Sequence, residues 1–345
     1  MSLLNSLTAK LQRHPKRIVF PEGNEPRIIQ AARQLASWRC GVPLLLGDRA
    51  EIKEMAARLD VRLDGIRILD PGRSDDADLF LPMLDSLPAF KDLPLKEKEG
   101  LLLDHHTFSS LMLVSGRADA MVSGATITTA EGLRSLFRII PTQPTVRTAS
   151  SMMILDQENT NVGHNGILFL ADCGVLPEPS AEQLADIAVS TADIARHLTG
   201  EDPRVAFLSF VSHASEPRHD SIPKIREAVP IAQAKAAARG IPTDFEGELQ
   251  IDAALDPEVA RYKGLSNSEV AGRANVLIFP DLNSGYIASR MLQVVAEART
   301  YGQILVGLEK PCAEVSRGAH VYDIVGTAII TACQAIDRNL LYVKQ

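Results

Sequence analysis

The segment that ends at Asp323 combines residue types that bind anions with one that accepts a proton. Ser316, Arg317 and Gly318 follow one another, and the carboxylate of Asp323 comes shortly after them. Hydroxyl and guanidinium groups donate hydrogen bonds to a phosphate or an oxyanion, and a glycine lets the backbone approach closely. Asp323 stands at the start of the apolar run 324–336, which predicts a helix. The segment suggests transfer of an acyl or phosphoryl group, with helix capping as the alternative role for Asp323.

A second candidate segment follows the strand-like run that ends near Ser123. Ser123 and Gly124 come directly after apolar residues, and Thr128 and Thr129 precede a helical pattern that carries Arg134. Their hydroxyl and backbone N–H groups are suited to an anion at a helix N-terminus. Ordinary helix capping by Thr128 or Thr129, with a solvated arginine face, is the alternative.

Two more polar segments are weaker candidates. Asp281 and Asn283 follow an apolar run, and they either position a ligand or hold a turn and cap the next helix. Strand alternation would place Glu248, Gln250 and Asp252 on one side of a strand. That polar row is either the wall of a site or the exposed side of an ordinary strand.

Short apolar runs alternate with helix-length segments along the whole chain. We expect strands at 17–20, 42–46, 118–122, 151–155, 166–171, 205–208, 276–279 and 303–308. We expect helices at 25–38, 130–139 and 180–198, and Ser180 and Gln183 form a capping box for the last of them. This alternation predicts an α/β fold with largely parallel sheets, in which ligands bind at the carboxyl ends of strands.

Composition excludes several classes of protein. The chain has 345 residues, 46% of them hydrophobic, so two domains are expected. A net charge of −7 argues against a nucleic-acid partner, and no apolar run is long enough for a membrane span. The N-terminus lacks the pattern of a signal peptide, so we expect a cytoplasmic protein. The four cysteines are far apart, which predicts neither disulfides nor a zinc site, and Cys312 is of interest only because it lies near Ser316.

Several catalytic motifs are missing from the sequence. It contains no Gly-x-Ser-x-Gly, His-Glu-x-x-His, P-loop or Gly-x-Gly-x-x-Gly pattern. These absences argue against zinc hydrolases, P-loop kinases and ordinary Rossmann dehydrogenases, and we expect no metal.

Taken together, the candidate segments resemble the phosphate acyltransferase family, and its phosphate acetyl/butyryl transferases in particular. The resemblance runs in the family's order from about Arg17 to the end of the chain. The matching strings are 19–23, 118–125, 247–250, 274–283, 316–318 and 323–325. Each string is short, so the resemblance depends on their collinear order.

The resemblance implies an enzyme of acetate metabolism, a phosphate acetyltransferase. Its reaction converts acetyl-CoA and phosphate reversibly to CoA and acetyl phosphate by direct attack of the CoA thiolate, with no cofactor. The implied fold has two three-layer α/β domains that flank a cleft, as in isocitrate and isopropylmalate dehydrogenases. Residues 1–151 with 303–345 would form the first domain and 152–302 the second, with the active site in the cleft between them. Homodimers are usual in the family.

The resemblance also implies roles for the residues of the first segment. Asp323 would take the thiol proton of CoA, Ser316 would hydrogen-bond the acyl phosphate, and Arg317 would balance the phosphoryl charge. CoA is polyanionic whereas the chain is net negative, so binding needs a local positive patch, for which Arg134, Arg138, Lys310 and Arg317 are candidates. The substrate-binding residues that we predict are Ser123, Gly124, Thr128, Thr129, Arg134, Asn283 and Lys310.

Departures from the family pattern leave alternatives open. Ala313, Glu314 and Val315 replace the usual Asn-Asp-Leu, and Ile127 and Tyr286 occupy positions that are often different. A phosphate propionyl- or butyryltransferase is therefore an alternative to acetyl transfer. A non-catalytic acetyl-CoA-sensing domain of the same fold is another, and a metal- and NAD-dependent dehydrogenase of that fold is a third. The presence of Ser316, Arg317 and Asp323 together favours an active transferase.

Overall fold

The computed structural model describes residues 3–157, 162–216 and 219–337. The chain divides into two units by its internal contacts. Of the described residues, unit 1 contains Leu3–Pro141 and those from Leu308 to Asp337, and unit 2 contains those between Thr142 and Gly307. Boundaries at 151/152 and 302/303, as expected from the sequence, would fall inside two strands that pair with each other in unit 2. The hydrogen bonds between those strands explain why the division lies outside them.

The described part of unit 1 has a parallel sheet in the strand order β3-β2-β1-β4-β11. Its strands are β1 (Lys16–Phe20), β2 (Gly41–Leu46), β3 (Arg67–Leu69), β4 (Ala120–Ser123) and β11 (Cys312–Glu314). All residues of β4 and β11 are buried, as expected for parallel strands that are covered on both faces. The neighbouring strands β1, β4 and β11 all point the same way, so their following loops share one edge of the sheet.

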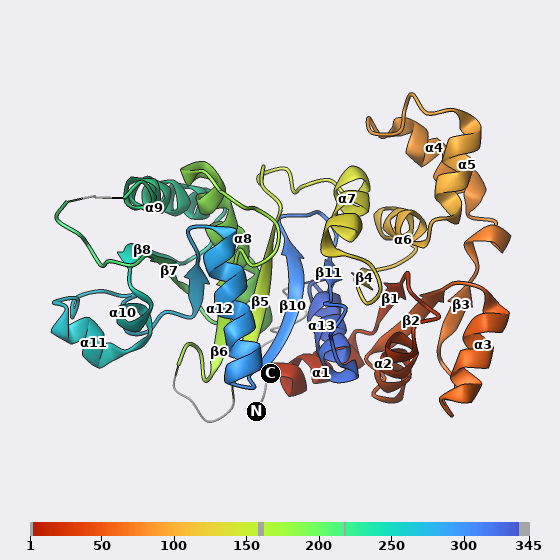
Figure 1. Cartoon of the computed structure of the whole chain (residues 1–345), viewed down its shortest axis with the longest axis horizontal. Coiled ribbons are helices and arrows are strands. Elements are labelled where there is room, and N and C mark those ends of the chain that lie inside the picture. Colours follow the sequence, from red (N-terminus) through yellow and green to blue (C-terminus); the bar gives the residue numbers. More distant parts are fainter. Residues whose placement is uncertain (1–2, 158–161, 217–218, 338–345) are drawn as a thin grey trace. The chain divides into compact units, whose positions relative to one another are not determined.

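Helices cover both faces of this sheet. Figure 1 shows α1, α2 and α13 on one side of the strands of unit 1, and α6 and α7 on the other. The helices of unit 1 are α1 (Leu3–Arg13), α2 (Pro26–Ser37), α3 (Arg49–Arg58), α4 (Ala77–Ser86), α5 (Leu95–Leu103), α6 (His105–Val114), α7 (Thr129–Ile139) and α13 (Val321–Cys333), with a short 3-10 helix η1 (Pro71–Arg73). α13 packs against α1, α2 and β4. The helix predicted from the apolar run 324–336 is thus confirmed as α13, with Asp323 in its first turn.

Unit 2 has a mixed sheet in the order β10-β5-β6-β9-β7-β8 among its described residues. The pairs β10–β5 and β5–β6 are antiparallel, and the other pairs are parallel. The strands are β5 (Ser150–Asp156), β6 (Ile167–Ala171), β7 (Arg204–Leu208), β8 (Asp244–Leu249), β9 (Val276–Ile278) and β10 (Arg299–Val306). The helices are α8 (Ala181–Thr199), α9 (Ser221–Ala238), α10 (Ile251–Leu255), α11 (Pro257–Tyr262) and α12 (Leu282–Val295).

The clearest local patterns in the sequence correspond to observed elements. α8 begins after Ser180, and the predicted capping box between Ser180 and Gln183 is present. The polar row predicted beyond Gly247 is wrong, because β8 ends at Leu249 and Asp252 belongs to α10. Glu248 is fully buried and pairs with Arg226 at 2.8 Å, so it is a structural anchor and not an open wall.

Candidate active site

The predicted site residues of unit 1 gather mainly at the carboxyl edge of its sheet. The loops 21–25, 124–128 and 315–320 follow β1, β4 and β11, which are neighbours in the sheet. Parallel strands bring such loops to one edge, where ligands of α/β proteins bind. The predicted residues that lie on the last two loops, at the adjoining strand end or on the helices that follow are Ser123, Gly124, Thr128, Thr129, Arg134, Ser316, Arg317 and Asp323.

Glu22 fixes the shape of the loop between β4 and α7. This side chain is 5% exposed. Its carboxylate accepts hydrogen bonds from the backbone N–H groups of Ala125 and Thr126, at 2.9 and 2.7 Å. The Thr126 hydroxyl donates to it as well, at 2.7 Å. Glu22 therefore occupies two backbone donors of this loop, those of Ala125 and Thr126, and it was missed although it lies in the string 19–23.

Arg27, near the start of α2, connects two of the three loops. Its Nη1 atom donates to the carbonyl oxygens of Arg317 and Ala319, at 2.7 and 2.9 Å. Its Nη2 atom donates to the carbonyl oxygen of Ala125 at 2.9 Å. The guanidinium also pairs with Glu25 at 2.6 Å. Arg27 thus holds the β11–α13 loop against the β4–α7 loop.

The N-terminus of α7 is capped by its own side chains. The Thr128 hydroxyl accepts from the Glu131 N–H at 3.4 Å, and the Thr128 N–H donates to Glu131 Oε2 at 3.0 Å, which forms a capping box. The Thr128 hydroxyl also donates to Glu131 Oε2, at 2.6 Å. The capping alternative for Thr128 is therefore confirmed. Hydrogen bonds from Thr128 hold the pKa of Glu131 below its usual range, and the charges of Arg134 and Arg317 lower that pKa further. Arg134 and Arg317 thus act on the same carboxylate at the start of α7.

The segment that carries Ser316 and Asp323 forms a turn followed by a helix start. Ser316 Oγ accepts from the Gly318 N–H at 3.2 Å. Asp323 Oδ2 accepts from the His320 N–H at 2.9 Å, so the capping role of this aspartate is present. Among the described residues, the guanidinium of exposed Arg317 takes part in no hydrogen bond or ion pair, so it is available to an anion.

Two predicted cations, Lys310 and Arg138, are not brought to this edge, and predicted Asn283 belongs to the other unit. Lys310 precedes β11, so it lies at the amino end of that strand, whereas Ser316 follows the carboxyl end. Arg138 is engaged structurally, because it stacks 4.4 Å from the Phe90 ring and donates to a carbonyl of the α4–α5 connection. Asn283 is an exposed residue in the first turn of α12 in unit 2.

Asp281 has the capping role that was the alternative to ligand binding. Its carboxylate accepts from the Ser284 N–H at 2.9 Å at the start of α12. The helix begins at Leu282.

Glu314, the last residue of β11, places a buried carboxyl group beside Ser123. It is 2% exposed, and its Oε1 atom accepts from the Ser123 hydroxyl at 2.5 Å. Burial raises the pKa of Glu314 to about 8, the Ser123 hydrogen bond opposes this rise, and the charge of Glu22 adds to it. Sequence reasoning noted Glu314 only as a departure from the family pattern.

Gly132 on α7 leaves the space that this carboxyl group fills. A Cβ atom built at Gly132 would lie 2.5 Å from Glu314 Oε1. We expect Gly132→Ala to lower the free energy of unfolding by about 2 kcal/mol, because the core there would be overpacked. Gly100→Ala on α5 is the matched control: nothing lies within 4 Å of its added Cβ, so it should stabilise by about 0.5–1 kcal/mol.

Urea unfolding of both alanine variants tests this expectation. The double variant with Glu314→Ala should lose most of the Gly132→Ala penalty, since the clashing group is gone. An equal effect of the two glycine replacements would contradict the packing argument.

The cysteines of the described residues lie in the core. Cys312 is fully buried, and burial raises the pKa of its thiol, so it is a packing residue of β11. The other three cysteines are also buried, and none of them forms a disulfide bond. No group of three or more potential metal ligands is found in the described ranges. Likewise, no helix among the described residues is long and apolar enough to cross a membrane.

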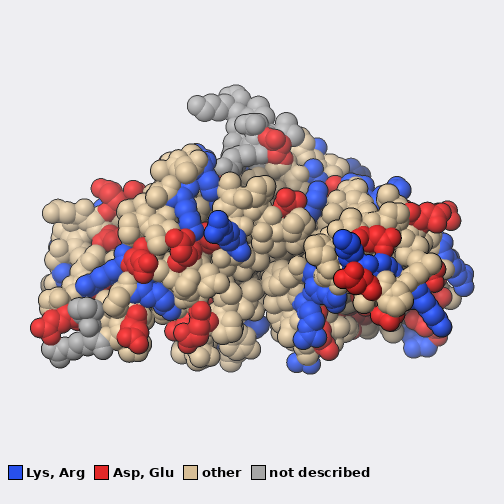
Figure 2. All heavy atoms as spheres, turned by 90° about the horizontal axis from the view of Figure 1, so that it is seen from above, with Lys and Arg blue, Asp and Glu red and all other residues tan. Residues whose placement is uncertain are grey.

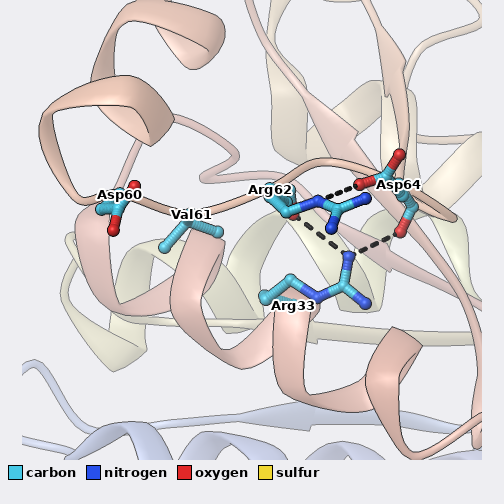
Figure 3. A pocket seen from close by; sticks show the side chains of 5 residues that line it. All are labelled: Arg33, Asp60, Val61, Arg62 and Asp64. Atoms are coloured by element: carbon cyan, nitrogen blue, oxygen red, sulfur yellow. Dashed lines mark hydrogen bonds and ion pairs between the residues drawn. The ribbon is translucent and has the colours of Figure 1, made fainter.

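Two surface hollows are lined by residues other than those at the carboxyl edge of the unit 1 sheet. One, of about 420 Å³, is lined by Arg33, Asp60, Val61, Arg62 and Asp64 (Figure 3). Its arginines are already paired: Arg33 donates to the carbonyl oxygens of Arg62 and Asp64, and Arg62 contacts the Asp64 carboxylate at 2.9 Å. The other hollow, of about 610 Å³, lies in unit 2 around α10 and α11. Neither contains a residue of the two segments around Ser123 and Ser316, although Asp252 of the polar row lines the second.

Surface charges of both signs are mixed on the face drawn in Figure 2. Lys and Arg side chains alternate with Asp and Glu, and they do not form a continuous basic stripe there. The chain carries a net charge of −7. An anionic ligand would therefore depend on a local group of cations, and not on the overall field.

Comparison with known proteins gives matches over nearly the whole chain. The family model for phosphate acetyl/butaryl transferase matches residues 2–332. A phosphate acetyltransferase from Thermoanaerobacterium thermosaccharolyticum is 40% identical over 335 residues, which cover 97% of this chain and 100% of that protein. A phosphotransacetylase from Streptococcus pyogenes has a crystal structure that matches with a TM-score of 0.86 and 35% identity, covering 96% of this chain and 98% of its own.

A more distant structure is similar in fold alone. The crystal structure of a 4-hydroxythreonine-4-phosphate dehydrogenase from Klebsiella pneumoniae is 12% identical and has a TM-score of 0.51. It covers 93% of this chain and 100% of its own. The predicted α/β class and its likeness to a dehydrogenase fold are therefore confirmed.

Proposed function

The chain belongs to the phosphate acetyl/butaryl transferase family, and we propose that it transfers an acetyl group reversibly between CoA and inorganic phosphate. The observation that carries this proposal is the similarity to phosphate acetyltransferases over 97% of the chain. The grouping of Ser316, Arg317 and Asp323 at one sheet edge of unit 1 supports it. CoA and acetyl phosphate are accordingly the proposed substrates.

The proposed reaction starts from acetyl phosphate and CoA. The thiol proton of CoA passes to Asp323, and the sulfur atom attacks the acetyl carbonyl carbon. The carbon–oxygen bond to phosphate then breaks, and its electron pair leaves with the phosphate. Arg317 and Arg134 balance the phosphoryl charge, and Ser316 donates a hydrogen bond to the acyl phosphate. The N-terminus of α7 adds a favourable field for the leaving anion.

The direct test is an acyl-CoA panel assayed with inorganic phosphate, in which release of free thiol is followed. We expect acetyl-CoA to give the highest kcat/KM. A higher kcat/KM with propionyl- or butyryl-CoA would assign the longer acyl group instead. Binding of acetyl-CoA without turnover of any substrate would mean a sensing domain and would contradict the proposed activity.

We also propose that the chain forms a homodimer, as the family resemblance implies. One side of α12 supports this, because apolar residues spaced along it are exposed. These residues are Ile287, Met291, Val294 and Val295. Light scattering should give twice the chain mass, and Val295→Asp should shift the protein toward the monomer mass. Tyr262→Asp, on exposed α11, is the control that should stay dimeric. A wild-type monomer would contradict the proposal.

A cytosolic location is proposed as well. The four cysteines form no disulfide bond, as in proteins of reducing compartments. Fractionation of the native host followed by immunodetection would test this location.

A further inference from the structure

Glu314 stands where two elements of the proposed site meet. In the sheet register it is opposite Ser123, and both residues end their strands. The Val315 N–H donates to the Ser123 carbonyl at 2.7 Å, directly beyond the contact between the two side chains. One covalent step further, Ser316 and Arg317 begin the anion-binding turn. Ser123 and Gly124 form a corner where β4 ends. The contacts of Glu314 therefore set the distance between this Ser123–Gly124 corner and that turn.

Two glycines on different elements make room for the Glu314 carboxyl group. A Cβ atom at Gly124 would lie 2.6 Å from Glu314 Oε2, and one at Gly132 would lie 2.5 Å from Oε1. Gly124 also has a φ of +97°, a conformation that side chains disfavour. The Ser123–Gly124 corner and the start of α7 thus both pack tightly against the Glu314 carboxyl group.

The carboxyl group has fewer partners than a buried carboxylate needs. Oε1 accepts from Ser123, whereas Oε2 has no hydrogen-bond partner in the part of the chain that the structure describes. A buried carboxylate is normally stabilised by several hydrogen bonds or by a cation. This arrangement suits the neutral acid better than the anion.

We propose that Glu314 is a positioning residue for the anionic substrate, holding Ser123 and Gly124 in register with Ser316 and Arg317. This inference rests on the proposed transferase function. The neutral form of Glu314 lets a phosphate approach, whereas its ionised form adds a negative charge beside the same corner. Positioning and charge are therefore coupled in one side chain.

The titratable neighbours of this group come from each element around it. Glu22 lies on the β1–α2 loop, Cys312 is in the same strand, and Glu131 precedes Gly132 on α7. Burial and, to a smaller extent, the nearby Glu22 charge raise the pKa of Glu314 to about 8. Ionisation of Glu314 is thus expected between neutral and moderately alkaline pH.

The test compares wild type with Glu314→Gln, which keeps the size of the side chain and cannot ionise. Acetyl phosphate KM is measured from pH 7.0 to 9.5 at saturating CoA, a range in which acetyl phosphate keeps its charge. We expect the wild-type KM to rise about tenfold across this range and the Glu314→Gln KM to stay within about twofold. At pH 7.0 the two proteins should have similar kcat. Glu309→Gln, an exposed residue before β11, should follow wild type at every pH.

Glu314→Ala should raise KM at all pH values, because the corner loses its support. The inference is overturned if Glu314→Gln shows the wild-type rise in KM, or if folded Glu314→Ala keeps the wild-type KM. If Glu314→Ala does not fold, the Gln comparison alone decides.

If wild type transfers no acyl group, the proposed function fails and a binding measurement decides the inference. Calorimetric titration with inorganic phosphate at pH 8.0 and 9.5 should show a wild-type affinity that weakens with pH and a Glu314→Gln affinity that does not. Equal pH dependence in the two proteins overturns the inference.

Discussion

Replacing Asp323 by asparagine is expected to lower kcat for CoA-dependent acyl transfer by about 10²- to 10³-fold. Asp323 Oδ2 accepts the His320 N–H at 2.9 Å, and an asparagine oxygen can accept the same bond. The start of α13 should therefore stay capped, and the unfolding midpoint should change little. An amide cannot take the thiol proton at neutral pH, so turnover should fall while the fold persists. The measurement is kcat from single-substrate series for CoA and for acetyl phosphate, together with urea unfolding.

A helix cap without a chemical role would give a different result. Asp256 caps α11 in unit 2 by accepting from the Glu258 N–H at 2.8 Å. Asp256→Asn is therefore a matched control, and it should keep the wild-type kcat. If Asp323→Asn behaves like this control, the assignment of Asp323 as the base is wrong. Asp323→Ala separates the two roles further, since it should lose the cap, at about 1 kcal/mol, as well as the turnover.

Local patterns in the sequence predicted most of the elements that position this site. α8 was predicted to within one residue because its apolar stripe and its capping box are both short-range features. The central strands were predicted because parallel strands covered on both faces are continuous apolar runs. The division into units was less accurate, since it depends on pairing between β5 and β10, which lie far apart in the sequence.

The residues that shape the site were harder to predict than those expected to react. Ser316, Arg317 and Asp323 were proposed because their types and order suit the chemistry, and their roles stay predictions. Arg27 donates a hydrogen bond to the carbonyl oxygen of Ala319, 292 positions away in the sequence. No local sequence pattern could predict a contact between residues that far apart. Glu22 likewise reaches the N–H of Ala125, 103 positions away.

Lys310 illustrates the opposite error. It is close to Ser316 in the sequence, which suggested a single loop, but β11 lies between the two residues. Two residues that are close in the sequence can lie far apart in space when a strand separates them, because the two ends of a strand lie at opposite edges of the sheet.

Glu314 is expected to make the stability of the protein fall with rising pH. Burial raises the pKa of this carboxyl group from 4.5 to about 8. Between these values the folded chain keeps a proton that the unfolded chain has released, so raising the pH favours unfolding. The contribution of the neutral acid is complete below the unfolded pKa and is lost as the pH passes the folded pKa. Between pH 5.5 and 8.5 the loss amounts to about 3 kcal/mol.

Glu314→Gln isolates this contribution from those of other groups. Its free energy of unfolding, measured with urea at pH 5.5 and 8.5, should gain about 3 kcal/mol relative to wild type over that interval. His106, whose pKa is lowered by burial, titrates in both proteins and cancels from the difference. Exposed Glu309 gives the control, since Glu309→Gln should differ from wild type by the same amount at both pH values. A pH-independent difference for Glu314→Gln would mean that Glu314 is ionised in the folded protein. The single hydrogen bond from Ser123 would then have to stabilise a buried charge beside Glu22, which burial and repulsion both oppose.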